Sequence, residues 1–166
     1  MTRNRFAIFL AGAAFAPLAA LPVAGATAQL RTPPAAGTRL ATVGAAKKTV
    51  EVRNTRLGKI LVNSSGRTLY LFKKDARGKS ACTGECAKFW PPLRVKGRPS
   101  AGSGISAGKL GTISRSDGTR QVTYNGHPLY TFAQDSKAGQ TNGQGLVAFG
   151  ASWFVLSPSG SQISHK

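Results

Sequence analysis

Acidic residues are scarce in this sequence, and several familiar catalytic patterns are missing from it. Asp and Glu together number five among 166 residues. A calcium site takes about six to eight oxygen ligands, so this small supply of carboxylates disfavours one. The sequence also has no glycine-rich phosphate loop, no zinc-hydrolase helix and no serine on a sharp strand-to-helix turn. We therefore expect a protein that is not an enzyme, with no catalytic residue, no cofactor and no bound metal.

Long apolar runs are missing beyond the first 28 residues. Arg3 and Arg5 precede an apolar, alanine-rich run over residues 6–28, which ends in Ala26-Thr27-Ala28. A basic start, an apolar middle and a small-residue exit are the three parts of a cleavable signal peptide. The competing interpretation is a membrane anchor, because about 20 apolar residues span a bilayer. Two prolines in the run and the small-residue exit favour cleavage. We expect a secreted or periplasmic protein, cleaved near Ala28, with no transmembrane segment afterwards.

Positive charge is the most unusual bulk property. The 23 Lys and Arg residues give the chain a net charge of +18, and removing Arg3 and Arg5 with the signal peptide leaves +16. A surface this basic attracts polyanions, and salt screens that attraction. The basic residues are scattered and are not interleaved with aromatic residues, which disfavours specific nucleic-acid binding. We expect anionic cell-envelope polymers or an anionic lipid surface as partners, and the oligomeric state stays open.

The chain repeats itself at an offset of 60 residues. Seven identities share one register, namely Gly58/Gly118, Val62/Val122, Gly66/Gly126, Leu69/Leu129, Tyr70/Tyr130, Phe72/Phe132 and Asp75/Asp135. Such self-similarity indicates a repeat architecture. We expect repeat one at about residues 56–93 and repeat two at about residues 110–157, within one domain over residues 49–160. The Pro/Ala/Gly/Thr-rich residues 29–48 predict a flexible linker, and residues 161–166 a tail.

Each repeat predicts a β-hairpin. The first has a turn at Ser64-Ser65-Gly66 and the second at Asn125-Gly126, a pair that tolerates positive φ at both positions. One short helix is expected near Thr83–Trp90, stopped by the following prolines. The predicted strands are residues 49–53, 59–63, 68–73, 110–115, 119–124, 128–133, 146–149 and 153–156. This pattern predicts an all-β or mainly β fold of antiparallel hairpins, with two pseudo-symmetric repeats packed as one sandwich- or barrel-like domain.

Two stretches carry a family resemblance. Tyr70-Leu71-Phe72-Lys73-Lys74-Asp75 and Tyr130-Thr131-Phe132-Ala133-Gln134-Asp135 match the motif Tyr-x-(Phe/Trp/Tyr)-x-x-Asp. The surrounding Cys82-Thr83-Gly84-Glu85-Cys86 and Trp90-Pro91-Pro92-Leu93 fit the same pattern. The chain resembles a family of bacterial secreted-repeat lipoproteins of unknown function, over roughly residues 56–160. It lacks a cysteine at the signal-peptide exit, so attachment of a lipid there is not expected.

The motif side chains have two interpretations. Alternation along a strand places Tyr70 and Phe72 on one face, with Leu69 and Leu71 on the other. In the first interpretation the aromatic residues are core residues, and Asp75 accepts backbone N–H groups from the following loop. In the second, Asp75 and its counterpart Asp135 share one site that binds a hard cation. Trp90 and Trp153 are expected to cap opposite ends of the core.

Cys82 and Cys86 are the only cysteines. In an exported protein the simplest expectation is one structural disulfide, which requires a turn or a distorted helix at this spacing. A redox-active pair and a metal or cofactor site are the alternatives. We therefore expect an exported, non-enzymatic cell-envelope protein that binds anionic components; the alternative is an extracytoplasmic redox or metal-linked protein that uses Cys82 and Cys86.

Overall fold

The computed structural model describes residues 47–165, and these residues form a mainly β structure. The predicted signal peptide over 1–28 and almost all of the predicted linker lie outside the described residues. No helix within 47–165 is long and apolar enough to cross a membrane. The elements are β1 (Val50–Thr55), β2 (Gly58–Asn63), β3 (Tyr70–Phe72), α1 (Glu85–Phe89), a 3₁₀ turn (Ala107–Lys109), β4 (Leu110–Ser114), β5 (Arg120–Tyr124), β6 (His127–Pro128), β7 (Val147–Ala148) and β8 (Ala151–Val155).

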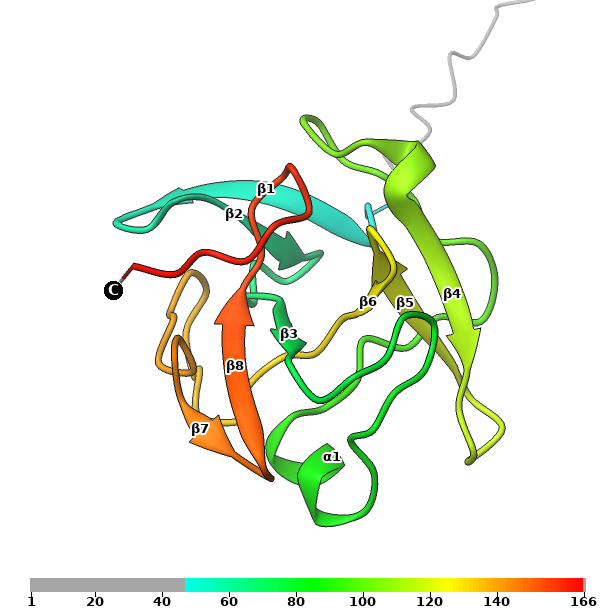
Figure 1. The fold of residues 1–166 in the computed structure, drawn as a ribbon. Helices are drawn as coiled ribbons and strands as arrows, with labels where there is room; N and C mark the ends of the chain where they lie inside the picture. The colour runs from blue at the N-terminus through cyan, green and yellow to red at the C-terminus, as the bar shows by residue number, and fades with distance from the viewer. Residues whose placement is uncertain (1–46, 166) are drawn as a thin grey trace, which may run out of the picture. The chain divides into compact units, whose positions relative to one another are not determined.

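The strands form three antiparallel sheets in the orders β1-β2, β3-β8-β7 and β4-β5-β6. In Figure 1, β1 and β2 run across the top, β4 to β6 lie on the right, and β7 and β8 lie at the lower left with α1 below. The mainly β fold with antiparallel hairpins and one short helix is confirmed, and the helix falls inside the predicted range. The arrangement is consistent with two repeats packed as a sandwich.

The two hairpins are equivalent, but their turns differ in length. The pair Tyr124↔His127 closes the two-residue turn Asn125-Gly126, and Thr123↔Pro128 is the next pair outwards. Both turn residues have positive φ, 51° and 81°. In the first repeat the pair equivalent to Thr123↔Pro128 is Val62↔Thr68, which encloses one residue more. The structural offset is therefore 61 residues before the turn and 60 after it. A sequence alignment without gaps hides this shift, because it pairs Val62 with Val122.

The last extended segment of each repeat pairs with the other repeat. β8 of repeat two pairs with β3 of repeat one, and the Leu61 N–H donates to the Leu156 carbonyl at 2.9 Å. In the same way, the Val122 N–H of repeat two donates to the Leu93 carbonyl of repeat one at 2.8 Å. The predicted return strands 68–73 and 128–133 therefore follow their own hairpins only at the start. Each repeat therefore supplies hydrogen-bond partners for backbone groups of the other repeat.

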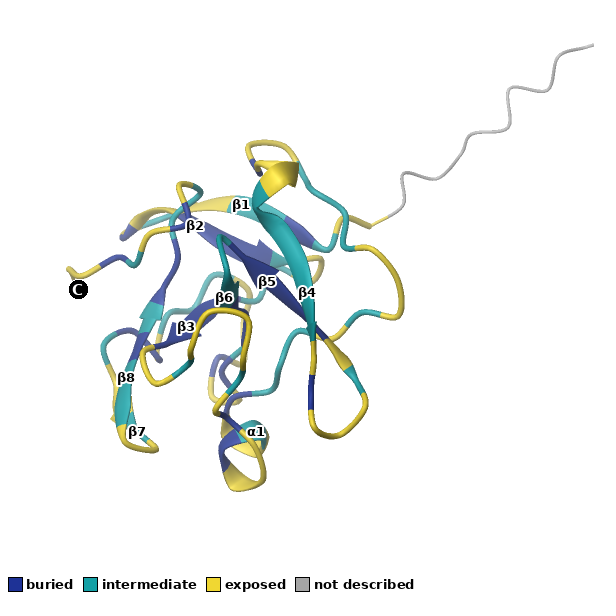
Figure 2. Ribbon diagram, turned by 45° about the vertical axis from the view of Figure 1, so that its right-hand side comes forward, coloured by how far each residue is buried: buried dark blue, intermediate teal, exposed yellow. Residues whose placement is uncertain are grey.

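Strand alternation divides the buried side chains into two cores. The motif Tyr and Phe side chains fall in one core, and the Leu side chains between them fall in the other. Figure 2 shows β3 and most of β5 coloured as buried. The first core contains Tyr70, Phe72, Tyr130 and Phe132, and the second contains Leu69, Leu71 and Leu129. The predicted facing of the motif residues is confirmed.

Four aromatic rings form a continuous stack at the centre of the first core. Trp90 and Trp153 stack with ring centroids 3.9 Å apart and planes 2° from parallel. Phe72 stacks on Trp153 at 4.0 Å, and Phe132 stacks on Trp90 at 4.2 Å. The expectation that the two tryptophans cap opposite ends of the core is wrong. Exchange of the repeats' last segments brings the tryptophans face to face, and the sequence does not reveal that exchange.

Gly143 tests how tightly this stack is enclosed. A Cβ at Gly143 would lie 2.6 Å from the Trp90 ring and 3.0 Å from the Tyr70 ring. We expect Gly143→Ala to lower the free energy of unfolding by about 1–3 kcal/mol, because a packed core resists added volume. The control is Gly97→Ala, where nothing lies within 4 Å, and a surface change of this kind shifts stability by only about 0.5 kcal/mol. Denaturant unfolding followed by tryptophan fluorescence checks this, and equal effects of the two substitutions would contradict the packing.

Candidate functional site

The motif tyrosines meet at the centre of the structure. The Tyr70 N–H donates to the Tyr130 carbonyl at 2.8 Å, and the Tyr130 N–H donates back at 3.0 Å. This antiparallel bridge joins the two repeats at equivalent residues. Both tyrosine side chains are fully buried. The bridge therefore fixes the two copies of the motif against each other.

Each motif tyrosine bonds to the aspartate of the other repeat. The Tyr70 hydroxyl donates to Asp135 Oδ2 at 2.7 Å, and the Tyr130 hydroxyl donates to Asp75 Oδ2 at 2.8 Å. The second oxygen of each carboxylate accepts a backbone N–H from the following loop. Ala81 donates to Asp75 at 2.7 Å, and Asn142 donates to Asp135 at 2.9 Å. The motif thus joins the end of one repeat's strand to a loop of the other.

This arrangement bears on the two interpretations of the motif aspartates. Both carboxylate oxygens of Asp75 and Asp135 already accept hydrogen bonds, as the first interpretation predicts for the loop N–H groups. No group of three or more His, Cys, Asp or Glu side chains suited to a metal occurs within residues 47–165. The geometry therefore favours a structural role for both aspartates and gives no support to a shared cation site.

Burial perturbs the titration of all four motif groups. Burial raises the pKa of Asp75 and of Asp135 above the ordinary range of a carboxyl group. Burial also raises the pKa of Tyr70 and of Tyr130, and the neighbouring aspartate adds to the effect. Each tyrosine therefore keeps its proton and donates a hydrogen bond to the carboxylate. Because both tyrosines are fully buried, a substrate cannot reach them. We therefore attribute their raised pKa values to packing in the core.

A buried arginine orders the polar groups around Tyr130. Arg115 Nη1 donates to Ser80 Oγ at 2.7 Å, and Ser80 lies 2.8 Å from the Tyr130 hydroxyl. Because Tyr130 donates to Asp75, the chain of donors runs from Arg115 through Ser80 and Tyr130 to Asp75. A second Arg115 nitrogen donates to the Cys82 carbonyl at 2.6 Å. Sequence reasoning missed Arg115, because nothing in the pattern separates one buried arginine from many exposed ones.

Cys82 and Cys86 form a disulfide with a Cα–Cα distance of 5.2 Å. The predicted bridge is confirmed, and it spans the start of α1, where Gly84 has a positive φ of 55°. Both cysteines are buried in the first core. Burial of the sulfur atoms supports a structural role, because a thiol or disulfide that exchanges must be accessible.

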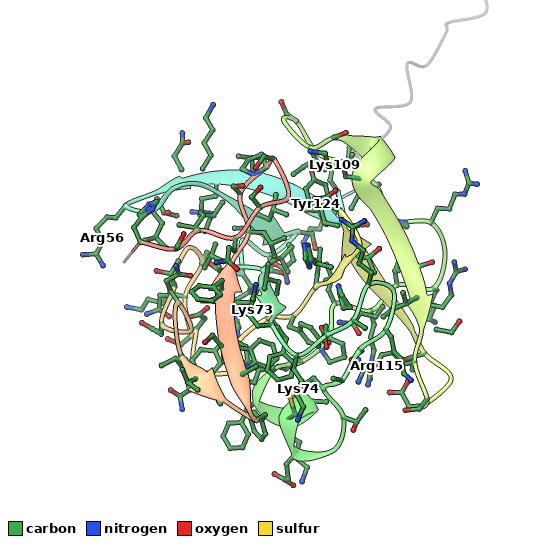
Figure 3. The ribbon with its side chains drawn as sticks, viewed as in Figure 1. Arg56, Lys73, Lys74, Lys109, Arg115 and Tyr124 are labelled. Atoms are coloured by element: carbon green, nitrogen blue, oxygen red, sulfur yellow. A yellow bond between two sulfur atoms is a disulfide. The ribbon has the colours of Figure 1, made fainter. Side chains whose placement is uncertain are left out.

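A groove and an exposed basic surface lie outside the buried motif. A groove of about 900 Å³ runs between the β1–β2 turn and the loop over residues 138–146. Arg53 and Arg56 line one side, and Gln140, Thr141 and Asn142 line the other. Figure 3 shows Arg56 extending from the β1–β2 turn at the left of the view. The groove offers positive charge and amide groups, which suit an anionic or polyhydroxylated chain.

One family model matches the chain twice. Its description is a secreted repeat of unknown function, and it matches residues 51–94 and 111–157. The two segments together cover more than half of the chain and coincide with the two halves that exchange partners. No curated protein and no solved structure matches the chain.

The crossed hydrogen bonds predict a specific pattern of energetic coupling. In a double-mutant cycle, Tyr70→Phe and Asp135→Asn should couple by about 0.5–3 kcal/mol, because their side chains bond directly. Tyr70→Phe and Asp75→Asn belong to different pairs, and we expect a coupling below about 0.5 kcal/mol. Urea unfolding of the single and double variants measures both values. A larger coupling between Tyr70 and Asp75 than between Tyr70 and Asp135 would disprove the crossed pairing.

The raised carboxyl pKa predicts an unusual dependence of stability on pH. The unfolded-state pKa of an aspartate is about 3.9, and burial raises the folded-state pKa of Asp135 above it. The folded protein therefore holds this proton more tightly, so the contribution of Asp135 to stability is complete below about pH 4 and is lost as the pH rises through the folded-state pKa.

We therefore expect the stability of the native protein, relative to Asp135→Asn, to increase as the pH falls from about 7 to about 4. The variant cannot titrate at this position, so the difference between the two unfolding free energies isolates the group. Urea unfolding at a series of pH values measures it. A difference that stays constant or decreases on acidification would show that the carboxyl pKa is not raised.

Proposed function

Because the chain belongs to the family of secreted repeats of unknown function, we propose that it is a non-enzymatic cell-envelope protein that binds anionic polymers or lipid surfaces. The observation that carries the proposal is positive charge that the fold leaves uncompensated. The full chain has 23 basic and five acidic residues. An excess of this size produces a potential that attracts polyanions over several ångströms of solvent.

The fold uses two of its five acidic groups in the crossed pairs with tyrosine, and two more form ion pairs at the surface. Asp75 and Asp135 bond to the buried tyrosines, so they neutralise little of the surface. Glu85 pairs with Lys88, and Asp117 pairs with Arg94 and lies 3.7 Å from the buried Arg115. Most exposed lysine and arginine side chains in the described part of the chain therefore have no acidic partner. The basic surface faces solvent nearly unopposed.

The distribution of the positive charge favours an extended partner. Exposed basic residues occur on the β1–β2 turn, over residues 73–79 and over residues 94–98. These segments come from different parts of the fold and do not converge on one enclosed site. A polymer or a membrane surface can contact separated charges at once, whereas a small ligand cannot.

The compartment supports the same proposal. The family is secreted, and the proposed maturation is cleavage near Ala28, which releases the protein into the periplasm or the medium. Anionic polymers and lipid headgroups are abundant there. The motif supports a non-enzymatic role, because its tyrosines are fully buried and its aspartates bond to them across the two repeats.

The electrostatic proposal is tested by binding to polyphosphate, with uncharged dextran as the neutral control. We expect binding to polyphosphate only, with the affinity falling by at least about tenfold between about 0.05 M and 0.2 M salt, because screening weakens exposed charge interactions. Fluorescence anisotropy of labelled polymer measures the affinity. Binding to dextran, or binding to polyphosphate that salt leaves unchanged, would refute the proposal.

Two single substitutions provide matched controls for that measurement. Arg56→Gln removes one positive charge, and Glu51→Gln removes one negative charge from the neighbouring strand β1. We expect the first to weaken and the second to strengthen binding, since each changes the net charge by one in opposite directions. Shifts of the same sign would show that folding changes, and not charge, dominate.

A further inference from the structure

Three large apolar side chains are exposed around the β7–β8 turn. Phe89 is the last residue of α1, and Val147 and Phe149 belong to the β7–β8 hairpin. Their exposed fractions are 46%, 76% and 40%. The rings of Phe89 and Phe149 lie 6.1 Å apart, so the helix end and the hairpin turn form one surface. We call Phe89, Val147 and Phe149 the apolar tip. In Figure 1, this end of the β7–β8 hairpin lies beside α1 at the lower edge of the structure.

The turn at Phe149 has a backbone conformation that disfavours an aromatic residue. Phe149 and Gly150 form a two-residue turn between Ala148 and Ala151, with φ values of 58° and 90°. An aromatic residue rarely adopts positive φ, whereas asparagine does so readily. The β5–β6 turn has the same geometry, with asparagine at the equivalent position, Asn125. The chain therefore keeps a phenylalanine where asparagine would relax the backbone, and the ring that results is partly exposed.

Positive charge borders the apolar tip. Lys74 Nζ lies 3.4 Å from the Phe149 carbonyl oxygen, and the exposed Lys73 precedes it on the segment after β3. Figure 3 shows Lys74 where the lower end of β8 approaches α1. Lys88 lies beside Phe89 on α1, where it pairs with Glu85, the one acidic residue of that helix. Apolar rings with a basic border suit an anionic bilayer, whose headgroups attract lysine and whose interface accepts phenylalanine.

We propose that the apolar tip is a membrane-docking element that inserts Phe149 and Val147 into the interface of an anionic lipid bilayer, with Lys73 and Lys74 contacting the headgroups. This inference rests on the proposed function and names the lipid surface as a partner. A two-residue turn that projects its side chains can enter an interface without a complementary cavity in the partner. The basic border selects an anionic surface, and the exposed apolar area adds attraction that salt does not screen.

The test compares binding to vesicles with binding to polyphosphate. The vesicles contain phosphatidylcholine alone or phosphatidylcholine with phosphatidylglycerol, and co-sedimentation measures the bound fraction. The main variant carries Phe149→Asn with Val147→Thr. Asparagine fits the left-handed turn, and threonine keeps a β-branched residue in the strand, so we expect the variant to fold with an unchanged or increased melting temperature.

We expect this variant to lose at least about tenfold in affinity for the anionic vesicles, because two apolar groups no longer enter the interface. Its affinity for polyphosphate should stay unchanged. Lys74→Gln should weaken vesicle binding more than Lys96→Gln, which removes an exposed charge elsewhere.

The possible failures are distinguishable. If the native protein binds polyphosphate but not the anionic vesicles, or if the Phe149/Val147 variant binds vesicles as well as the native protein does, the docking element is disproved and the electrostatic proposal stands. If the native protein binds neither, the proposed function fails as well. Equal binding to both kinds of vesicle would disprove the role of the lysines.

Discussion

The fold depends on an exchange of partners between two copies of one motif. Tyr70 and Tyr130 pair through their backbones, and each hydroxyl donates to the aspartate of the opposite copy. A single repeat would leave a buried hydroxyl and a carboxylate without partners, which costs more than a hydrogen bond gains. The spacing from tyrosine to aspartate in one copy is therefore fixed by the position of the other copy. Neither repeat is a complete folding unit.

The sequence predicted the secondary-structure elements and the faces on which their side chains lie. It did not predict that the last segment of each repeat pairs with the other repeat. Alternation placed Tyr70 and Phe72 together on one face, because side chains change face at every residue of a strand. Alternation could not show that Trp153 stacks on Trp90, because that contact requires the last extended segment of each repeat to pair with the other repeat. Arg115 was missed for a related reason: its burial comes from distant carbonyl and hydroxyl acceptors that no local pattern encodes. Local periodicity in the sequence predicts the strands, whereas contacts between residues distant in the sequence build the cluster of motif side chains.

The same exchange removes two of the five carboxylates from the surface. The motif requires one aspartate in each repeat, and both are turned inward to bond tyrosine and a loop N–H. Three acidic residues then remain to oppose the basic side chains of the whole chain. The family motif thus uses carboxylates to hold the core and leaves the charge balance of the surface to other residues. A basic surface is compatible with this fold because the core does not depend on surface ion pairs.

The core and the exposed tip follow different physical rules, and the proposed docking role of the tip rests on that difference. In the core, hydrophobic facing, polar pairing and turn chemistry all agree, as expected of a sequence that specifies one structure. At the β7–β8 turn two of these rules are broken together: an aromatic residue takes positive φ, and its ring remains exposed. The Asn125-Gly126 turn has similar φ values but places asparagine, which tolerates positive φ, at the position that Phe149 occupies. The proposed contact with a lipid bilayer gives a reason for keeping phenylalanine at that turn, in addition to the contact of its ring with Phe89.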